Sequence, residues 1–341
     1  MTKQLLFLGI IMCLQVTSHA QSVRIDSVNN QKSGVGYIEN LNDRISIKLD
    51  VNDNIEGYQI SNQNKHLTLF PNTSISNRLT IHYRFISLSV DWIPSFIPGN
   101  ADSQFKGHTT SNEFTLNIHA GRVFQSLSLA RTKGFYLENT GDYQANWTED
   151  KDPYVLFPDL IYRGIRGQTT YKCNPRFSIK ALTVQSERQL KSAGSFMPML
   201  YYHYFFIDDR TPLTIDNSTF KTKNLELLLS MSYLHTFVFH QSYYVSLGVI
   251  PGAGWMFTNN TIRYPDDAIR QNQQNMIFRF KGRFAMGYNG HRFFAGTHVI
   301  AATSSYVQNN ASAIIGNDQI SYQIFAGYRF NRPGVFKRFH L

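Results

Sequence analysis

Few residues in this chain have the types and the spacing that catalysis requires. Ser103-Gln104-Phe105-Lys106 has the serine–lysine spacing of hydrolases in which a lysine amine activates a serine hydroxyl. The four residues lie in a polar stretch that we expect to be a loop, and about one such match arises by chance in a chain of this length. We therefore predict no catalytic residue here.

A second set of residues suits a barrel enzyme with its site at the rim. His108, Ser111 and Asn112 supply a base, a nucleophile and an orienting amide, as a phospholipase-like or protease-like site requires. Such a site also requires the three side chains to converge at one level of the barrel. An enzyme of this kind is an alternative to a protein without catalytic activity.

Residues for metal or nucleotide chemistry are not placed together in the sequence. His235 and His240 have no third ligand at metal-site spacing, and the chain contains no cysteine cluster. Gly252-Ala253-Gly254 lacks the third glycine and the following helix of a dinucleotide fingerprint. We expect neither a metal nor another cofactor.

Three cations alternate with aromatic residues in the most informative stretch of the chain, residues 276–288. Arg279, Lys281 and Arg283 share one face of a predicted strand, and the other face carries mainly rings. Neighbours on one strand face lie about 7 Å apart, so like charges need water or acidic partners. As a strip that lines a lumen, they predict an anion-preferring pore. In the alternative, acidic residues on a neighbouring strand or an inserted loop neutralise them and the barrel is plugged.

A denser polar cluster lies earlier in the chain. It comprises Gln185, Glu187, Arg188, Gln189 and Lys191. One interpretation is an inner or loop network that closes or narrows the pore. The other is a solvated loop between strands. If the strand continues through this cluster, adjacent residues project to opposite faces and do not pair directly.

The start of the chain predicts export. Residues 1–20 combine Lys3, a short apolar run and a small-residue cleavage site, as in a signal peptide. Residues 21–43 form a polar leader, and residues 44–341 form a single predicted β-barrel domain. After cleavage only Cys173 remains, so an intrachain disulfide is excluded and the fold must be stable without one.

Composition favours a membrane barrel. Charged residues make up 16% of the 341 residues, whereas the chain has 26 Phe and 19 Tyr. The mean hydropathy is −0.28, and no apolar run after the export signal is long enough for a transmembrane helix. Barrel strands expose only alternate residues to lipid, which reconciles these values. A secreted soluble β-sandwich that binds a partner is the alternative. The net charge of +10 comes from scattered cations, which argues against nucleic-acid binding.

Alternation predicts thirteen strands, with short turns at one end and long connections at the other. They cover residues 44–50, 76–84, 86–93, 112–120, 123–132, 160–172, 176–186, 195–207, 225–238, 243–257, 276–288, 292–304 and 319–331. If both termini lie on the same side of the membrane, the number of strands must be even. Thirteen is odd, so one strand is misassigned between about residues 187 and 225. We predict an antiparallel up-and-down transmembrane β-barrel with about 14 strands, residues 211–220 supplying the extra one. Twelve is the alternative.

Several short motifs spread over residues 37–330 point to a known family. They are Tyr37-Ile38-Glu39, Asp43-Arg44-Ile45-Ser46, Phe70-Pro71-Asn72, Lys133-Gly134-Phe135-Tyr136-Leu137, Phe177-Ser178, Gln185-Ser186-Glu187-Arg188-Gln189, Lys191-Ser192-Ala193-Gly194-Ser195-Phe196, Tyr233, Thr236-Phe237 and Pro251-Gly252. In order and spacing they resemble domain of unknown function 4421 (DUF4421), a family of uncharacterised Gram-negative, Bacteroidetes-type outer-membrane proteins. The resemblance implies an outer-membrane barrel and transfers no activity.

The sequence therefore predicts a porin-like outer-membrane β-barrel in a Gram-negative bacterium. We expect a channel or a structural scaffold rather than an enzyme. The expected partners are outer-membrane lipid, the barrel-insertion machinery and small anionic solutes, with no nucleic acid. The sequence sets no oligomeric state.

Overall fold

The computed structural model describes residues 36–53, 57–62, 65–94, 96–97, 100, 103–149, 151–215, 217–307 and 314–331. The predicted signal peptide (1–20) and most of the predicted polar leader (21–43) lie outside these residues.

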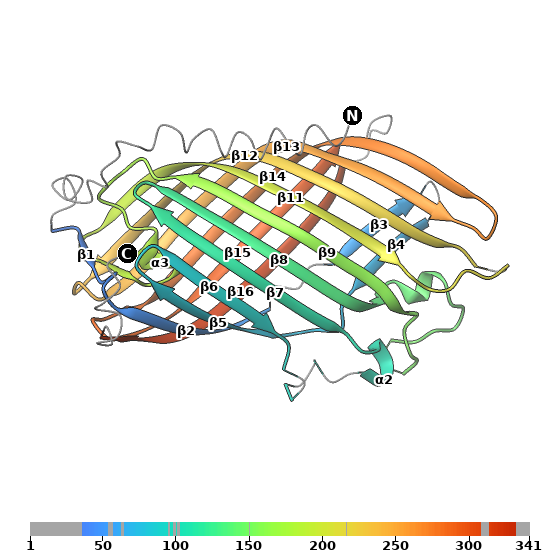
Figure 1. Cartoon of the computed structure of the whole chain (residues 1–341), viewed down its shortest axis with the longest axis horizontal. Helices are drawn as coiled ribbons and strands as arrows, with labels where there is room; N and C mark the ends of the chain where they lie inside the picture. The colour runs from blue at the N-terminus through green and yellow to red at the C-terminus, as the bar shows by residue number, and fades with distance from the viewer. Residues whose placement is uncertain are drawn as a thin grey trace, which may run out of the picture. The chain divides into compact units, whose positions relative to one another are not determined.

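Twelve antiparallel strands form a closed ring (Figure 1). In pairing order they are β2 (Ile45–Asn52), β5 (Ser76–Tyr83), β6 (Ile86–Trp92), β7 (Thr110–Ala120), β8 (Val123–Leu137), β9 (Leu156–Tyr171), β11 (Ala193–Asp209), β12 (Thr219–Phe239), β13 (Tyr243–Arg263), β14 (Ala268–Asn289), β15 (Phe293–Val307) and β16 (Ile314–Phe330). The last strand, β16, pairs with β2, which closes the ring. Closure pairs both edges of every ring strand, as a barrel in a membrane requires.

A hairpin adds two strands to the same sheet. β3 (Tyr58–Asn62) and β4 (Lys65–Phe70) pair with each other, and β4 continues onto β8 through Leu69 opposite Leu137. The sheet thus contains fourteen strands, of which twelve form the ring. The predicted all-β antiparallel barrel is confirmed, and both predicted strand numbers have a counterpart in it.

The prediction of a strand over residues 176–186 is wrong. This stretch contains the short helix α3 (Lys180–Thr183), and β10 (Glu187–Gln189) follows and pairs with β1 (Ile38–Asn40). Its alternating apolar residues bury against the barrel wall and face no lipid. The described part of residues 211–218 is also not a strand, because β12 begins at Thr219. Removing the false crossing gives the even number that the termini require.

The two ends of the barrel differ. At the short-turn end, strands are joined through residues 84–85, 121–122, 240–242 and 290–292. At the long-loop end lie the described parts of the connections 53–75, 93–109, 138–155 and 210–218, with α2 (Ser103–Lys106) and the 3-10 turn η2 (Thr140–Asp142) among them. Residues 258–275, expected to be a long connection, instead extend β13 and β14, which leaves only 264–267 between them.

Side chains alternate between the two faces of the wall as the sequence predicts. Along β14, Phe278, Phe280 and Met286 are 44–48% exposed on the outside, whereas Ile277 and Ala285 are fully buried inside. The same order holds on β6, where Leu88 and Val90 face outward and Ser87, Ser89 and Asp91 inward. An apolar exterior around a polar interior is the arrangement that lipid requires. None of the described helices is both long enough and apolar enough to cross a bilayer.

Candidate functional site: the plugged lumen

Two segments that are distant in the sequence fill the short-turn end of the barrel. We call residues 36–44 and 172–192 together the plug; β1 comes from the first segment, and α3 and β10 come from the second (Figure 1). Ile38 lies opposite Gln189, and Glu39 lies opposite Arg188. The plug therefore joins the start of the chain to its middle inside one small sheet.

Apolar side chains seat the plug on the wall. Phe177 and Leu182 are fully or almost fully buried in a cluster with Leu234 of β12, Tyr244 of β13 and Ala285 of β14. Burying such side chains contributes on the order of 1.5–3 kcal/mol each. Because these apolar side chains pack against the inner wall, residues 176–186 do not form a lipid-facing strand.

Arg329 of β16 fastens the plug to the wall from within the lumen. Its side chain is 1% exposed, and its Nε donates a 2.6 Å hydrogen bond to the main-chain oxygen of Gln185. Its two terminal nitrogens donate to the Gly290 main-chain oxygen and to Oδ1 of Asn289. The guanidinium also lies 4.6 Å from the centre of the Phe294 ring. One residue of the last strand thus holds both the plug and a hairpin turn.

Arg188 of the plug makes the reciprocal connection. Its Nε donates to the main-chain oxygen of Asn289 at 2.8 Å, and its Nη2 donates to the main-chain oxygen of Gln241 at 3.0 Å. Nη2 also donates to Ser242 Oγ at 2.9 Å, and Nη1 pairs with Glu39 within the plug. A buried charge is tolerated only with such partners, and here the partners are two turns of the wall.

The other members of the predicted polar cluster also lie in the plug. Glu187 accepts a 2.6 Å hydrogen bond from Ser178 Oγ, and Gln189 Oε1 accepts one from the Ser178 main-chain nitrogen at 2.7 Å. Gln185 is fully buried, and Lys191 is exposed with its Nζ 5.5 Å from the Tyr37 ring centre. The structure brings the cluster together as an internal network of the plug. Its effect on a pore stays a prediction.

Lys172, the first residue of the plug segment 172–192, has a lowered pKa. Burial lowers the pKa of the Lys172 ammonium from its ordinary value, and Glu187 partly opposes this effect. The neighbouring cations Lys180 and Arg122 lower the same pKa further.

Lys48 of β2 connects the barrel wall to the plug at Thr183. Its Nζ donates to the main-chain oxygen of Thr183 at 3.0 Å and lies 3.0 Å from Asp50 Oδ1. Asp50 in turn accepts a 2.6 Å hydrogen bond from Gln323 Nε2. The ammonium also lies 5.2 Å from the Phe325 ring centre. Phe325 breaks the alternation of its strand because its ring faces this interior cation.

The predicted basic strip lies on the inner wall above the plug. Arg279, Lys281 and Arg283 all line one interior cavity of ≈170 Å³. Arg279 pairs with Glu226 of β12, and Lys281 Nζ lies 6.0 Å from the Tyr201 ring centre. The sequence left open that acidic residues neutralise the strip, and Glu226 does so for the charge of Arg279. The role of the strip in binding or conduction stays a prediction.

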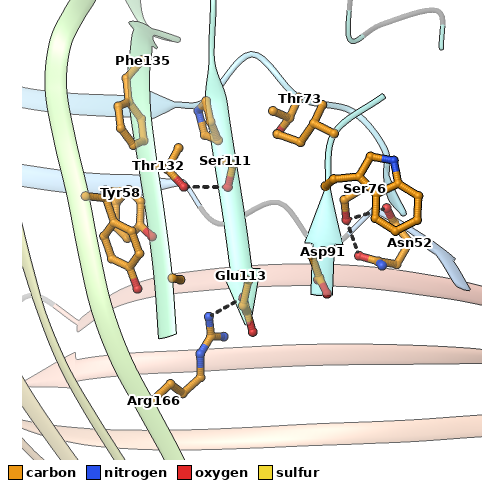
Figure 2. Close-up of a pocket in the computed structure, with 15 residues that line it drawn as sticks. Asn52, Tyr58, Thr73, Ser76, Asp91, Ser111, Glu113, Thr132, Phe135 and Arg166 are labelled. Carbon is orange, nitrogen blue, oxygen red and sulfur yellow. Dashed lines mark hydrogen bonds and ion pairs between the residues drawn. The ribbon is translucent and has the colours of Figure 1, made fainter. Parts of the chain in front are cut away.

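Two further cavities continue the lumen toward the long-loop end. One of ≈220 Å³ is lined by Lys48, Arg78, Arg283 and Glu113, and another of ≈80 Å³ is lined by Glu113 and Arg166. Figure 2 shows the second, in which Arg166 reaches toward Glu113, with Nη2 3.6 Å from Oε2. Because successive cavities share Arg283 or Glu113, they form a polar series through the barrel.

The β3–β4 hairpin narrows the long-loop end. Tyr58 stacks on Tyr162 of β9 with ring centres 5.0 Å apart. Figure 2 shows Tyr58 near Phe135 of β8, whose ring centre is 6.0 Å away. Leu69 and Leu160 are fully buried in the same cluster. The described part of the lumen is therefore narrowed at this end and filled by the plug at the other.

Comparison with known proteins settles the family. The family model described as "Domain of unknown function (DUF4421)" matches residues 24–330. The chain belongs to the DUF4421 family. No curated protein is similar in sequence to it.

Solved structures similar to this DUF4421 chain are remote. The ferric yersiniabactin uptake receptor FyuA from Yersinia pestis is 7% identical, with a TM-score of 0.26 over 84% of this chain and 43% of the receptor chain. This chain thus spans less than half of that receptor. Outer-membrane expressed OmpT of Vibrio cholerae is 8% identical, with a TM-score of 0.14 over 84% of this chain and 97% of that one. CdiB from Acinetobacter baumannii is 8% identical, with a TM-score of 0.20 over 84% and 60%.

The residues considered from sequence for a rim site do not share one environment in the DUF4421 barrel. Ser111 faces inward and its Oγ hydrogen-bonds with Thr132 Oγ1 at 2.8 Å (Figure 2). Asn112 and His108 are exposed. Ser103 and Lys106 lie on the short helix α2, where the sequence predicted a loop, and Lys106 Nζ lies 5.4 Å and 5.3 Å from the ring centres of Tyr136 and Tyr154. Among the described residues, no group of three His, Cys, Asp or Glu could hold a metal.

One polar relay in this DUF4421 member was missed from the sequence. Tyr162 Oη lies 2.9 Å from His203 Nε2, and His203 Nδ1 lies 3.8 Å from Glu226 Oε2. Glu226 also pairs with Arg279, so the relay ends on the basic strip. The members come from four strands. These four residues could have been grouped only if the register of the strands, and so which positions face inward at the same level, were known.

Proposed function

We propose that this protein is an outer-membrane β-barrel that is closed at rest by its plug and admits small anionic solutes when the plug is displaced. The closed ring and its apolar exterior support a membrane location. The proposal includes export through the predicted signal peptide. It also includes insertion by the barrel machinery of a Gram-negative bacterium. The short turns then face the periplasm and the long loops face outward.

The preference for anions rests on the charge of the inner wall. Arg279, Lys281 and Arg283 line one interior cavity, and Arg283 also lines the next. Fixed cations along a narrow path raise the local concentration of anions and repel cations. Glu226 offsets one of these charges.

The observation that carries the proposal is the way the plug is held. Arg188 and Arg329 bind the plug to the wall largely through main-chain oxygens of Gln185, Asn289 and Gln241. These hydrogen bonds fix the plug without making it a strand of the ring. The plug is therefore a separate element that can leave while the ring stays paired.

Planar-bilayer recording of the purified full chain tests the proposal. We expect little or no conductance from the natural chain. Conductance should appear when residues 176–190 are replaced by a short Gly–Ser turn. In that background, Lys281→Glu with Arg283→Glu should move the reversal potential from anion toward cation preference. Replacing Lys191, which is exposed, by Glu is the matched charge-reversal control.

The opposite results are equally informative. A large, steady conductance from the natural chain would show that the plug does not close the barrel. A folded plug-less barrel that stays silent would favour the second candidate, a structural scaffold. The scaffold draws support from the apolar cluster around Leu69 and Phe135, which narrows the long-loop end independently of the plug.

A further inference from the structure

The ≈220 Å³ cavity above the plug has the chemistry of a binding site. Cationic Lys48, Arg78 and Arg283 line it together with His298, and hydroxyl and amide groups of β5 to β8 complete the wall. Thr183 of the plug lines the same cavity. Its volume is far above the roughly 15 Å³ that one water molecule requires. A small polar ligand therefore fits without displacing the plug.

Two of the three cations already have acidic partners. Lys48 lies 3.0 Å from Asp50, and Arg78 donates to both carboxylate oxygens of Asp91 at 2.6 Å. Glu113, which also lines the cavity, lies 3.6 Å from Arg166 and 4.0 Å from Arg78. The charges of these six residues, three cations and three carboxylates, are thus balanced within the wall.

Arg283 is different. It lies between Gly248 and Ile300 in the sheet register, and within the described part of the chain its Nε is buried without a hydrogen-bond acceptor. The described residues also provide no ion pair to its guanidinium. A cation enclosed in this way is costly unless an opposite charge approaches it. The guanidinium fork suits an oxyanion, to which it donates two parallel hydrogen bonds.

His298 specifies the ligand further. Its ring is 5% exposed, and Nδ1 lies 3.1 Å from Gln323 Oε1. Because Gln323 Nε2 donates to Asp50, its Oε1 is the acceptor, which assigns the proton to Nδ1 of His298. Nε2 of the neutral ring is then an acceptor, and it is buried without a partner among the described residues. The cavity thus offers donors from Arg283 and an acceptor from His298.

We propose that this cavity binds a small oxyanion that keeps one acidic hydroxyl group, of which hydrogenphosphate is the simplest. The charged oxygens accept hydrogen bonds from Arg283, and the hydroxyl donates to His298 Nε2. The barrel wall separates the cavity from lipid, so the ligand is a free anion and not a lipid headgroup. This site rests on the proposed function for its class of solute. Binding to the closed barrel requires no conductance, so the two ideas fail separately.

Titration calorimetry of the purified full chain in detergent at neutral pH tests the site. Inorganic phosphate is the probe, and sulfate, which has no hydroxyl at this pH, is the comparison. We expect phosphate to bind and sulfate to bind more weakly. Arg283→Met should weaken phosphate binding by about tenfold or more, the usual loss for a charge-assisted hydrogen bond. Arg270→Met is the matched control, because it removes an exposed arginine from the same strand, β14, outside this cavity.

Each variant has a decisive outcome. His298→Phe, which retains a ring without an acceptor, should remove the preference for phosphate over sulfate. Absence of phosphate binding by the natural chain would overturn the site. Equal losses in Arg283→Met and Arg270→Met would show general electrostatic attraction instead. If Arg283→Met does not fold, Arg283→Lys, which keeps the charge but not the fork, should still weaken binding.

Discussion

Arg279 of β14 and Glu226 of β12 form an ion pair across the inner face of β13, the strand between them. Glu226 is 5% exposed and also lies 3.8 Å from His203 Nδ1. One carboxylate therefore serves two cationic or polar partners from opposite sides. The pair joins wall positions that the backbone ladder alone does not connect.

A double-mutant cycle measures this pair. Arg279→Gln and Glu226→Gln should each lower the free energy of unfolding, because each leaves a buried partner. The double variant should lose less than the sum, with a coupling on the order of 1–3 kcal/mol. Urea unfolding of the refolded barrel in detergent gives the four values. Additive losses would mean that the pair contributes no coupling.

The fastening of the plug makes a second prediction. Arg329→Gln removes a buried guanidinium that donates to Gln185, Gly290 and Asn289, and we expect a loss of about 3–5 kcal/mol. The folded band on an unheated denaturing gel should convert to the unfolded band at a lower temperature. Arg292→Gln is the control, because that side chain is exposed at the same end. Equal shifts in the two variants would contradict the role of Arg329.

The lipid-facing surface makes a third. Phe280 is 48% exposed on the outer wall, so Phe280→Asp should hinder insertion and lower the stability of the membrane-embedded barrel by up to a few kcal/mol. Folding into lipid vesicles, followed by the gel shift, measures this effect. Tyr143→Asp, in the long connection 138–155, should fold normally. Normal insertion of Phe280→Asp would mean that this face does not meet lipid.

Topology gives a fourth prediction. Cys173 is an exposed free thiol in the plug segment, and Asn146 is exposed in the connection 138–155 at the other end. A membrane-impermeant thiol reagent should miss Cys173 in intact cells and label Asn146→Cys in a Cys173→Ser background. Permeabilised cells should label both positions. The reverse pattern in intact cells would invert the proposed orientation.

Alternation in the sequence was sufficient to predict the wall. The period of two places Phe278 and Phe280 outside and Arg279 and Lys281 inside, because one strand geometry dictates both faces. It also predicted the confirmed barrel class. The same rule failed at 176–186, where Phe177 and Ile179 alternate with polar residues but pack against the inner wall. Periodicity indicates that one face of a segment is apolar, but it does not indicate whether lipid or the inner wall of the barrel covers that face.

Contacts between distant segments were beyond sequence reasoning. Arg329 and Gln185 are 144 residues apart, and Arg188 and Glu39 are 149 apart. No local spacing indicates such pairs, because they depend on where the ring closes and what it encloses. The ligand-binding features of Arg283 and His298 likewise appear only when β14 and β15 are placed side by side.

The pairing of β16 with β2 closes the ring and also brings Arg329 to the plug. The plug comes from the start and the middle of the chain, whereas Arg329, which locks it, arrives with the final strand. The last seam therefore completes two things at once: the pairing that closes the ring and the hydrogen bonds by which Arg329 holds the plug.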